Sequence, residues 1–186
     1  MIEAHLSALA ETALAARGTM ASALEAACAA VADAVRSGNK VLAFGNGGSA
    51  VQAQHFAAEL VVRYKADRPG LPSVALTCDG AILTACANDY SYDYVFARQV
   101  EALGRPGDVA LALSTSGTSP SVVKALEAAR ARGLVTILVT GSRGALEAAK
   151  WDHGVVVPSA ETAHVQEVTL AVLHLLCQAA EAGVRS

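Results

Sequence analysis

The sequence predicts a doubly wound α/β sandwich, in which a central, mostly five-stranded parallel sheet is covered by helices on both faces. Four continuous apolar runs have the length of strands, and a weaker fifth run resembles them. Helical patterns fill the intervals between these runs. Continuous apolar strands indicate burial on both faces, which is typical of parallel sheets. The alternation of strands and helices is typical of the α/β class.

Each element follows from its apolar pattern and its punctuation by glycine, proline or hydroxyl residues. The expected strands are 41–44, 73–76 (the weak run), 109–113, 135–139 and 155–157. The expected helices are 50–62, 81–87, 95–103, 121–132 and 165–181. We find no repeat or linker, and treat 1–186 as a single domain.

The N-terminal segment 1–37 is expected to be helical, in two pieces that Gly18 separates. Its apolar residues recur at spacings of three and four. They are Met20, Leu24, Ala27, Val31 and Val35. These helices exceed what coverage of one sheet face needs. We therefore expect this stripe to pack against another subunit.

Composition excludes several classes of protein. Of the 186 residues, 53% are apolar and 17% charged, which indicates a well-buried globular protein rather than a disordered one. A net charge of −3 gives no sign of a nucleic-acid partner. No apolar run reaches the length of a membrane span, and the N-terminus lacks a signal pattern. Four widely spaced cysteines fit a reducing compartment, so we expect a cytoplasmic protein.

A glycine-rich turn, Gly45–Ser49, follows the first strand and opens the next helix. Gly47 and Gly48 allow positive φ and a close approach of the backbone to a ligand, and Ser49 can cap the helix. A helix N-terminus at the carboxyl end of a strand is a favourable place for an anion. The alternative is a tight strand-to-helix turn without a ligand.

A second loop rich in hydroxyl groups follows the strand at 109–113. Its side chains Ser114, Thr115, Ser116 and Ser119 surround Gly117. Hydroxyl groups and backbone amides can bind phosphate without a lysine. The alternative is an ordinary capped turn, with Ser119 or Ser121 as the N-cap and Pro120 at the first helical position.

Two helical segments carry the residues suited to proton transfer or metal binding. His55 and Glu59 are four residues apart and share one face of a helix. Gln166 and His174 lie on the apolar last helix, where a buried polar side chain needs a partner. The alternatives are a solvated ion pair for the first two residues and satisfied core side chains for the last two.

Taken together, these residues closely resemble the phosphoheptose isomerases of the sugar-isomerase (SIS) fold, over nearly the whole chain. The matching segments are Gly45–Ser49, Gln54–Leu60, Ala87–Asp89, Ser114–Ser119, Val157–Ser159, Gln166–Glu167 and His174–Leu175. The resemblance implies conversion of sedoheptulose 7-phosphate into D-glycero-D-manno-heptose 7-phosphate through a cis-enediol. It also implies a homotetramer with active sites between subunits, and about one zinc ion (Zn²⁺) per site.

The resemblance implies a role for each matching position. Glu59 would be the base that moves a proton between C1 and C2, and His174 would be its acid partner. The implied metal residues are His55, Glu59, Gln166 and His174. The implied substrate contacts are Asn46, Gly47, Gly48, Ser49, Glu59, Arg63, Asn88, Asp89, Ser114, Thr115, Ser116, Ser119 and Gln166.

Some features depart from the family pattern or from simple helix geometry. Thr118 stands where asparagine is commoner, Thr169 where many members carry histidine, and His164 where arginine is frequent. Gln166 and His174 are eight residues apart, a rise of roughly 12 Å and a rotation of about 80° along a straight helix. Their membership of the site is therefore better supported than simultaneous ligation of one ion.

Two other functions remain open from the sequence. One is a non-catalytic SIS-fold protein of the type that binds the bacterial replication initiator, and the other is a SIS isomerase acting on another sugar phosphate. Both share the glycine turn or the hydroxyl loop with this chain. The first lacks the pair at Glu59 and His174, and the second lacks the His55–Glu59 pair. These residues therefore favour the heptose isomerase.

Overall fold

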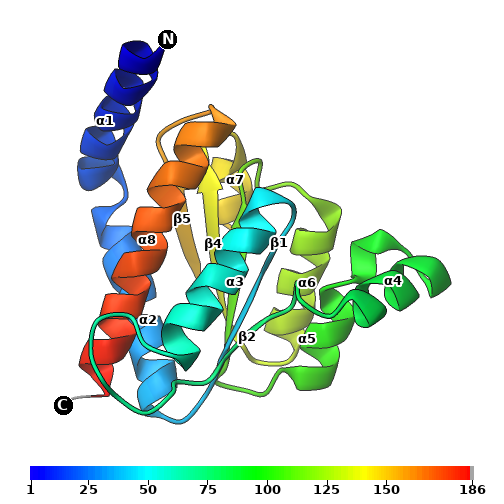
Figure 1. The fold of residues 1–186 in the computed structure, drawn as a ribbon. Coiled ribbons are helices and arrows are strands. Elements are labelled where there is room, and N and C mark those ends of the chain that lie inside the picture. The colour runs from blue at the N-terminus through cyan, green and yellow to red at the C-terminus, as the bar shows by residue number, and fades with distance from the viewer. Residues whose placement is uncertain (185–186) are drawn as a thin grey trace.

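The computed structural model of this chain describes residues 1–184 and confirms the expected sandwich (Figure 1). Five strands form one sheet in the order β2-β1-β3-β4-β5, and every neighbouring pair is parallel. The strands are β1 (Val41–Gly45), β2 (Ser73–Ala75), β3 (Val109–Ser114), β4 (Val135–Gly141) and β5 (His153–Val157). The weak run yields the short edge strand β2.

The register of the sheet brings the two turns that are expected to bind the ligand to one edge. Gly45 at the end of β1 pairs with Leu113 of β3, and Ser114 of β3 pairs with Thr140 of β4. Because all strands run the same way, the glycine turn after β1 and the hydroxyl loop after β3 are neighbours at the carboxyl edge. Both strands are buried along their full length, as their continuous apolar sequences predict.

Helices cover both faces and enclose two separate cores. The first core takes its residues from α1 (Ile2–Thr19), α2 (Ala21–Arg36), α3 (Gly48–Val61) and α8 (Thr162–Gly183). On the other face lie α4 (Gly80–Asp89), η1 (Tyr92–Tyr94), α5 (Ala97–Leu103), α6 (Pro120–Ala131) and α7 (Ala145–Ala148). The turns η1 and η2 (Ser142–Gly144) and the four-residue α7 are too short for a periodic pattern to show.

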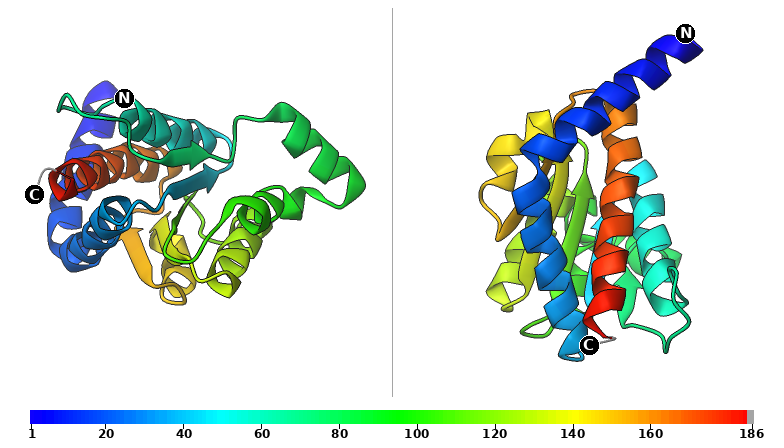
Figure 2. Two further views of the ribbon diagram at one scale, coloured as in Figure 1. Left: turned by 90° about the horizontal axis from the view of Figure 1, so that it is seen from below. Right: turned by 90° about the vertical axis from the view of Figure 1, so that its left-hand side faces the viewer.

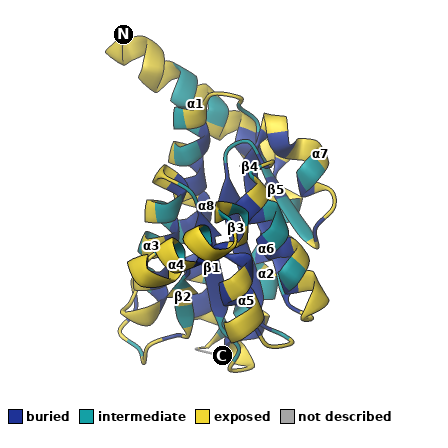
Figure 3. Cartoon of the chain, turned by 90° about the vertical axis from the view of Figure 1, so that its right-hand side faces the viewer, coloured by how far each residue is buried: buried dark blue, intermediate teal, exposed yellow. Residues whose placement is uncertain are grey.

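The expectation that the N-terminal stripe needs another subunit to cover it is wrong. Leu24 is 8% exposed and Val31 is fully buried, because α2 packs along α8 within the same chain. The break falls at Met20, where α1 and α2 bend by 74° (Figure 2). It is α1 that reaches beyond the body, and its Leu6 and Leu14 are exposed (Figure 3).

We tested the helices for the length and hydropathy of a membrane span. Within residues 1–184 no single helix is long and apolar enough; the bent pair α1 and α2 passes only when its two helices are taken together.

Candidate active site

Three of the residues expected in catalysis meet where α3 and α8 pack side by side (Figure 1). His55 Nε2 lies 3.0 Å from His174 Nε2, and Glu59 Oε1 lies 3.9 Å from His55 Nε2. The ring of Tyr64 stacks on that of His174, with 5.4 Å between the centroids. The side chains of His55 and Glu59 are 38% and 23% exposed, so this group is open to a ligand from solvent.

Gln166 lies near the start of α8, opposite the first residue of α3. Its side chain lies against Gly48 so closely that a β-carbon at residue 48 would collide with it. Gln52 Nε2 also donates a hydrogen bond to the backbone oxygen of Gln166, at 2.7 Å. Within the described chain, no hydrogen bond joins Gln166 to His55, Glu59 or His174. Its role as a ligand of the same ion stays a prediction.

The group of His55, Glu59 and His174 has donor atoms of the kind that zinc binds, but its three ligand atoms do not all lie within 4.8 Å of one another. Tetrahedral zinc with bonds of about 2.0–2.1 Å places its ligand atoms about 3.3–3.4 Å apart. The 3.0 Å between the two imidazole nitrogens and the 3.9 Å to the carboxylate oxygen lie on either side of that spacing. Two imidazoles and a carboxylate also form a donor set that zinc favours and that leaves a position open. The donor types therefore fit the expected metal, and ligation of one ion by all three side chains stays a prediction.

A buried ion pair fixes the end of α3 that carries Glu59. Arg68 donates hydrogen bonds to the backbone oxygens of Glu59 (2.9 Å) and Leu60 (2.8 Å), and to Glu181 Oε1 on α8 (3.1 Å). Glu181 also accepts from the backbone N–H groups of residues 64, 65 and 66. Arg68 thus satisfies carbonyl groups that a helix end leaves free and ties α3 to α8.

The surroundings of Glu181 favour its charged form. Burial by itself would raise the pKa, but the hydrogen bonds from Tyr64, Ala66 and Lys65, together with Arg68, lower the pKa of this carboxyl below its ordinary value of 4.5. Sequence reasoning missed this pair, although a carboxylate near the end of the apolar last helix was a usable signal.

Cys177 lies one turn beyond His174, but its thiol is inert. Burial, with the nearby Glu59 and Glu181, raises the pKa of Cys177 to about 12. The thiol is therefore protonated at neutral pH and is not a nucleophile.

The glycine turn has the positive φ that its sequence predicts, but the predicted cap of the next helix is wrong. Gly47 has φ of +56°, which favours glycine, and α3 begins at Gly48. Ser49 was expected to cap this helix, but it makes no cap hydrogen bond. It lies inside the first turn and is buried. Asn46 instead links the turn to its surroundings: it donates to Ser121 Oγ (3.0 Å) and accepts from the hydroxyl of Tyr92 (2.8 Å).

The hydroxyl loop is held by its own side chains. Ser114 Oγ accepts from Gly117 N (3.1 Å) and lies 3.5 Å from Ser119 Oγ. Ser116 Oγ accepts from the backbone N–H of Thr118, at 3.3 Å. Gly117 has φ of +73°, and a β-carbon there would lie 2.7 Å from Gly144 Cα. Pro120 begins α6, as predicted.

Two hydrogen bonds join the turns at the carboxyl edge to neighbouring elements. The backbone oxygen of Thr115 accepts from Gly141 N (3.2 Å), which joins the hydroxyl loop to the end of β4. The bond between Asn46 and Ser121 joins the glycine turn to the first turn of α6. The N-termini of α3 and α6 and the loop hydroxyls therefore lie at one edge, where an anion would find donors and favourable helix dipoles.

Three expected substrate contacts lie outside this edge. Asn88 and Asp89 end α4, are exposed and bond to each other at 2.8 Å. Helix α4 packs mainly on η1 and projects from the body on the side away from α8 (Figure 2). Arg63 is exposed just after α3. A single chain does not bring Asn88 and Asp89 to the His55–His174 pair, and their contact with substrate stays a prediction.

The fold and the paired turns are those of a SIS domain, and the SIS domain family matches residues 4–141 of this chain. A phosphoheptose isomerase from Bradyrhizobium sp. (strain ORS 278) is 50% identical over 167 residues, which cover 90% of this chain and 84% of that protein. Another from Thiobacillus denitrificans is 46% identical over 183 residues, covering 97% and 93%.

Solved structures agree with the sequence relatives. The phosphoheptose isomerase of Neisseria gonorrhoeae superimposes with a TM-score of 0.89 at 38% identity, covering 97% of both chains. That of Francisella tularensis gives 0.93 at 33% identity, covering 97% of this chain and 96% of the other. The chain belongs to the phosphoheptose isomerase family of SIS-domain proteins.

Proposed function

We propose that this chain interconverts sedoheptulose 7-phosphate and D-glycero-D-manno-heptose 7-phosphate. The observation that carries the proposal is the meeting of His55, Glu59 and His174 on α3 and α8, in the same domain as two anion-binding turns. A carboxylate and an imidazole in one open group can divide base and acid work. The choice of sugar rests on the relatives at about 50% identity, which are phosphoheptose isomerases.

The reaction is a proton transfer next to a carbonyl group. In the open-chain ketose, the carboxylate of Glu59 takes the proton from C1, and the C–H electron pair forms the double bond of a cis-enediol. His174 gives a proton to the oxygen on C2. Glu59 then returns the same proton or one from solvent to C2, while His174 takes the proton of the C1 hydroxyl, which leaves an aldehyde at C1 and restores both residues. No redox cofactor is consumed.

The contact between the two imidazoles determines how the ring of His174 is oriented. His55 and His174 are within hydrogen-bond distance, so one ring donates and the other accepts. His55 thereby orients the ring of His174, and the stacked ring of Tyr64 limits its rotation. A zinc ion held by His55, Glu59 and His174, with Gln166 as a further expected ligand, would take the place of this hydrogen bond between the two rings and would polarise the substrate carbonyl.

The phosphate group of the substrate would lie at the carboxyl edge of the sheet. We assign it to the hydroxyls of Ser114, Ser116 and Ser119 and to the N–H groups that open α3 and α6. This placement uses binding energy from a remote group to orient C1 and C2 at the catalytic residues. The charge of the phosphate also retains such a substrate inside a cell, so we place the enzyme in the cytoplasm.

A homotetramer is part of the proposal, and the surface of α1 supports it. A groove of about 850 Å³ runs between α1, α2 and α8. Its floor is mainly apolar and includes Leu9, Met20, Leu24, Val172 and Leu175. Leu6 and Leu14 add exposed apolar surface on α1. Soluble proteins seldom leave such a surface uncovered, and a second copy of this chain is the occupant we propose.

Oligomerisation would also explain the residues that a single chain leaves apart. Asn88 and Asp89 stand on the projecting α4, which packs mainly on η1 rather than on the helices that carry the catalytic pair. Sites completed by a neighbouring subunit would bring such residues to the substrate.

The test is an assay with purified protein and sedoheptulose 7-phosphate, followed by NMR. The proposal expects the aldehyde-derived anomeric signals of an aldoheptose 7-phosphate. Hexulose and pentulose phosphates, assayed in parallel, should react at least tenfold more slowly. Preference for one of them would assign a different sugar, and no conversion of any would favour a non-catalytic SIS-fold protein.

A further inference from the structure

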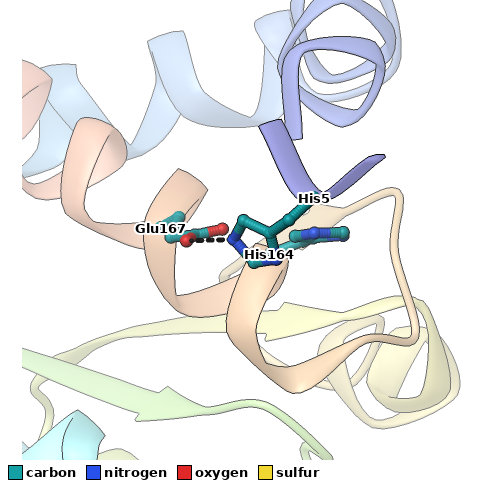
Figure 4. Close-up of side chains that lie close together, drawn as sticks. All are labelled: His5, His164 and Glu167. Carbon is teal, nitrogen blue, oxygen red and sulfur yellow. Dashed lines mark hydrogen bonds and ion pairs between the residues drawn. The ribbon is translucent and has the colours of Figure 1, made fainter. Parts of the chain in front are cut away.

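A second group of metal-ligating side chains lies between α1 and α8, outside the proposed catalytic group. It consists of His5 near the N-terminus and His164 and Glu167 in the first turns of α8 (Figure 4). A ring nitrogen of each histidine and a carboxylate oxygen of Glu167 all lie within 4.8 Å of one another. In the described part of the chain, no other set of three or more such residues is this close.

Contacts already bring these three side chains together. His5 Nε2 lies 2.9 Å from Glu167 Oε1, within hydrogen-bond distance. The rings of His5 and His164 lie 4.8 Å apart between centroids, tilted by 56°. Figure 4 shows His5 reaching from α1 to both residues on α8. The contacts therefore join two helices whose sequences are far apart.

His164 carries an unusual nitrogen. Its Nε2 atom is buried and has no hydrogen-bond partner within residues 1–184. A buried polar atom without a partner is unfavourable, and each one in a native structure calls for an explanation such as an ion. The lone pair of an unpaired imidazole nitrogen is also what a transition metal binds.

We propose that His5, His164 and Glu167 bind one divalent ion of the zinc class and thereby fasten α1 to α8. Two imidazoles and one carboxylate suit zinc, and they suit a hard, all-oxygen-seeking ion such as magnesium poorly. Ligand atoms around tetrahedral zinc lie about 3.3–3.4 Å apart, so the group must contract by up to about 1.5 Å. The exposed side chains of His5 and Glu167, at 43% and 37%, are free to make that adjustment.

The two metal groups lie at different levels of α8, because Glu167 and His174 are seven residues apart, about two turns of the helix. His174 meets His55 of α3, whereas Glu167 meets His5 of α1. The ion at His5 touches no residue assigned to the reaction. Its effect would be mechanical, since α1 makes few other contacts with the body and binding would favour its docked position.

Metal binding to untagged protein tests this inference. After chelator treatment, zinc is titrated calorimetrically into His55→Gln, which disables the catalytic group, and into the double variant His55→Gln/His5→Gln. We expect one zinc per chain in the first protein and none in the second. His55→Gln/His153→Gln is the matched control, because His153 lies on β5 outside both groups, and it should still bind one.

A second readout follows the helix itself. Zinc should slow amide hydrogen exchange in residues 2–10 of His55→Gln at least fivefold and leave the double variant with His5→Gln unchanged. The inference fails if His55→Gln binds no zinc, or if removing His5 alters neither the stoichiometry nor the exchange. Zinc bound by wild type and lost in His55→Gln would support the catalytic metal alone and overturn this second site.

Discussion

His55 and His174 stand 119 residues apart in the chain, yet their Nε2 atoms lie 3.0 Å apart. The contact depends on α3 and α8 running side by side across one face of the sheet. Neither helix by itself brings two imidazoles to this place. The pairing therefore makes the catalytic group a property of the tertiary fold, and each of its members can be tested separately.

Replacing His174 by asparagine tests its role as the acid partner. Asparagine can still form hydrogen bonds, but it does not titrate, so kcat should fall about 10²–10³-fold while KM changes little. Tyr64→Phe is the control, because it keeps the stacked ring, and its kcat should stay within about twofold. A His174→Asn enzyme with kcat near that of wild type would remove His174 from the mechanism.

Removing metal tests the fit of zinc to the catalytic group. We expect prolonged chelation to abolish most isomerisation and zinc to restore it. His55→Gln should show both low activity and at least tenfold weaker binding of zinc at this site, since one of the nitrogen ligands is lost. Elemental analysis that finds no metal in fully active protein would leave Glu59 and His174 to act without an ion.

Substitution on the outer face of α1 tests the proposed assembly. Leu14 is 64% exposed in a single chain, so Leu14→Asp should fold but place a charge in the proposed interface. Light scattering should give wild type about four times the 18.9 kDa of one chain, and the variant a smaller mass with lower activity. Leu146→Asp, at an 87% exposed position on α7, should remain assembled. A fully active wild-type monomer would contradict the proposal.

Replacing Glu181 by glutamine tests the ion pair at the end of α3. Arg68 would be left buried without its counter-charge, so the free energy of unfolding should fall by about 3 kcal/mol at pH 7. Denaturant titration measures this change. Glu101→Gln, at an exposed pair with Arg98, is the control and should change it by less than about 0.5 kcal/mol.

The same pair gives a pH dependence with a defined sign. The pKa of Glu181 is lower in the folded protein than its ordinary value of 4.5, so its contribution is complete above that pH. The contribution is lost as the pH falls through the folded value. The difference in stability between wild type and Glu181→Gln should therefore shrink below pH 4.5, and a difference that grows there would contradict the account.

Much of the fold could be predicted because local pattern and burial agree. The runs at 41–44 and 109–113 are apolar throughout, since both faces of β1 and β3 are covered. The same agreement explains why Gly47 and Gly117, both at positive φ, could be identified as turn residues. Patterns failed for α7, where four residues are too few for a helical period.

The site was harder to predict, because partners in space leave little trace in sequence. The spacing of His55 and Glu59 indicates a shared face, but nothing local indicates that His174 lies opposite. The prediction for the stripe from Met20 to Val35 was wrong for a related reason. An amphipathic stripe has the same sequence pattern whether α8 or a second subunit covers it. His5 gave no signal at all, since its partners lie on α8.

The measurement that tests the central claim most directly is isomerisation of sedoheptulose 7-phosphate by wild type and Glu59→Gln in deuterium oxide. Glutamine keeps the size of the side chain but cannot accept the C1 proton. Wild type should form the aldoheptose 7-phosphate with at least part of it deuterated at C2, while Glu59→Gln, equally assembled and loaded with added zinc to wild-type occupancy, should be at least about 10²-fold slower. Glu101→Gln should match wild type. Turnover by Glu59→Gln at the wild-type rate would show that Glu59 is not the base.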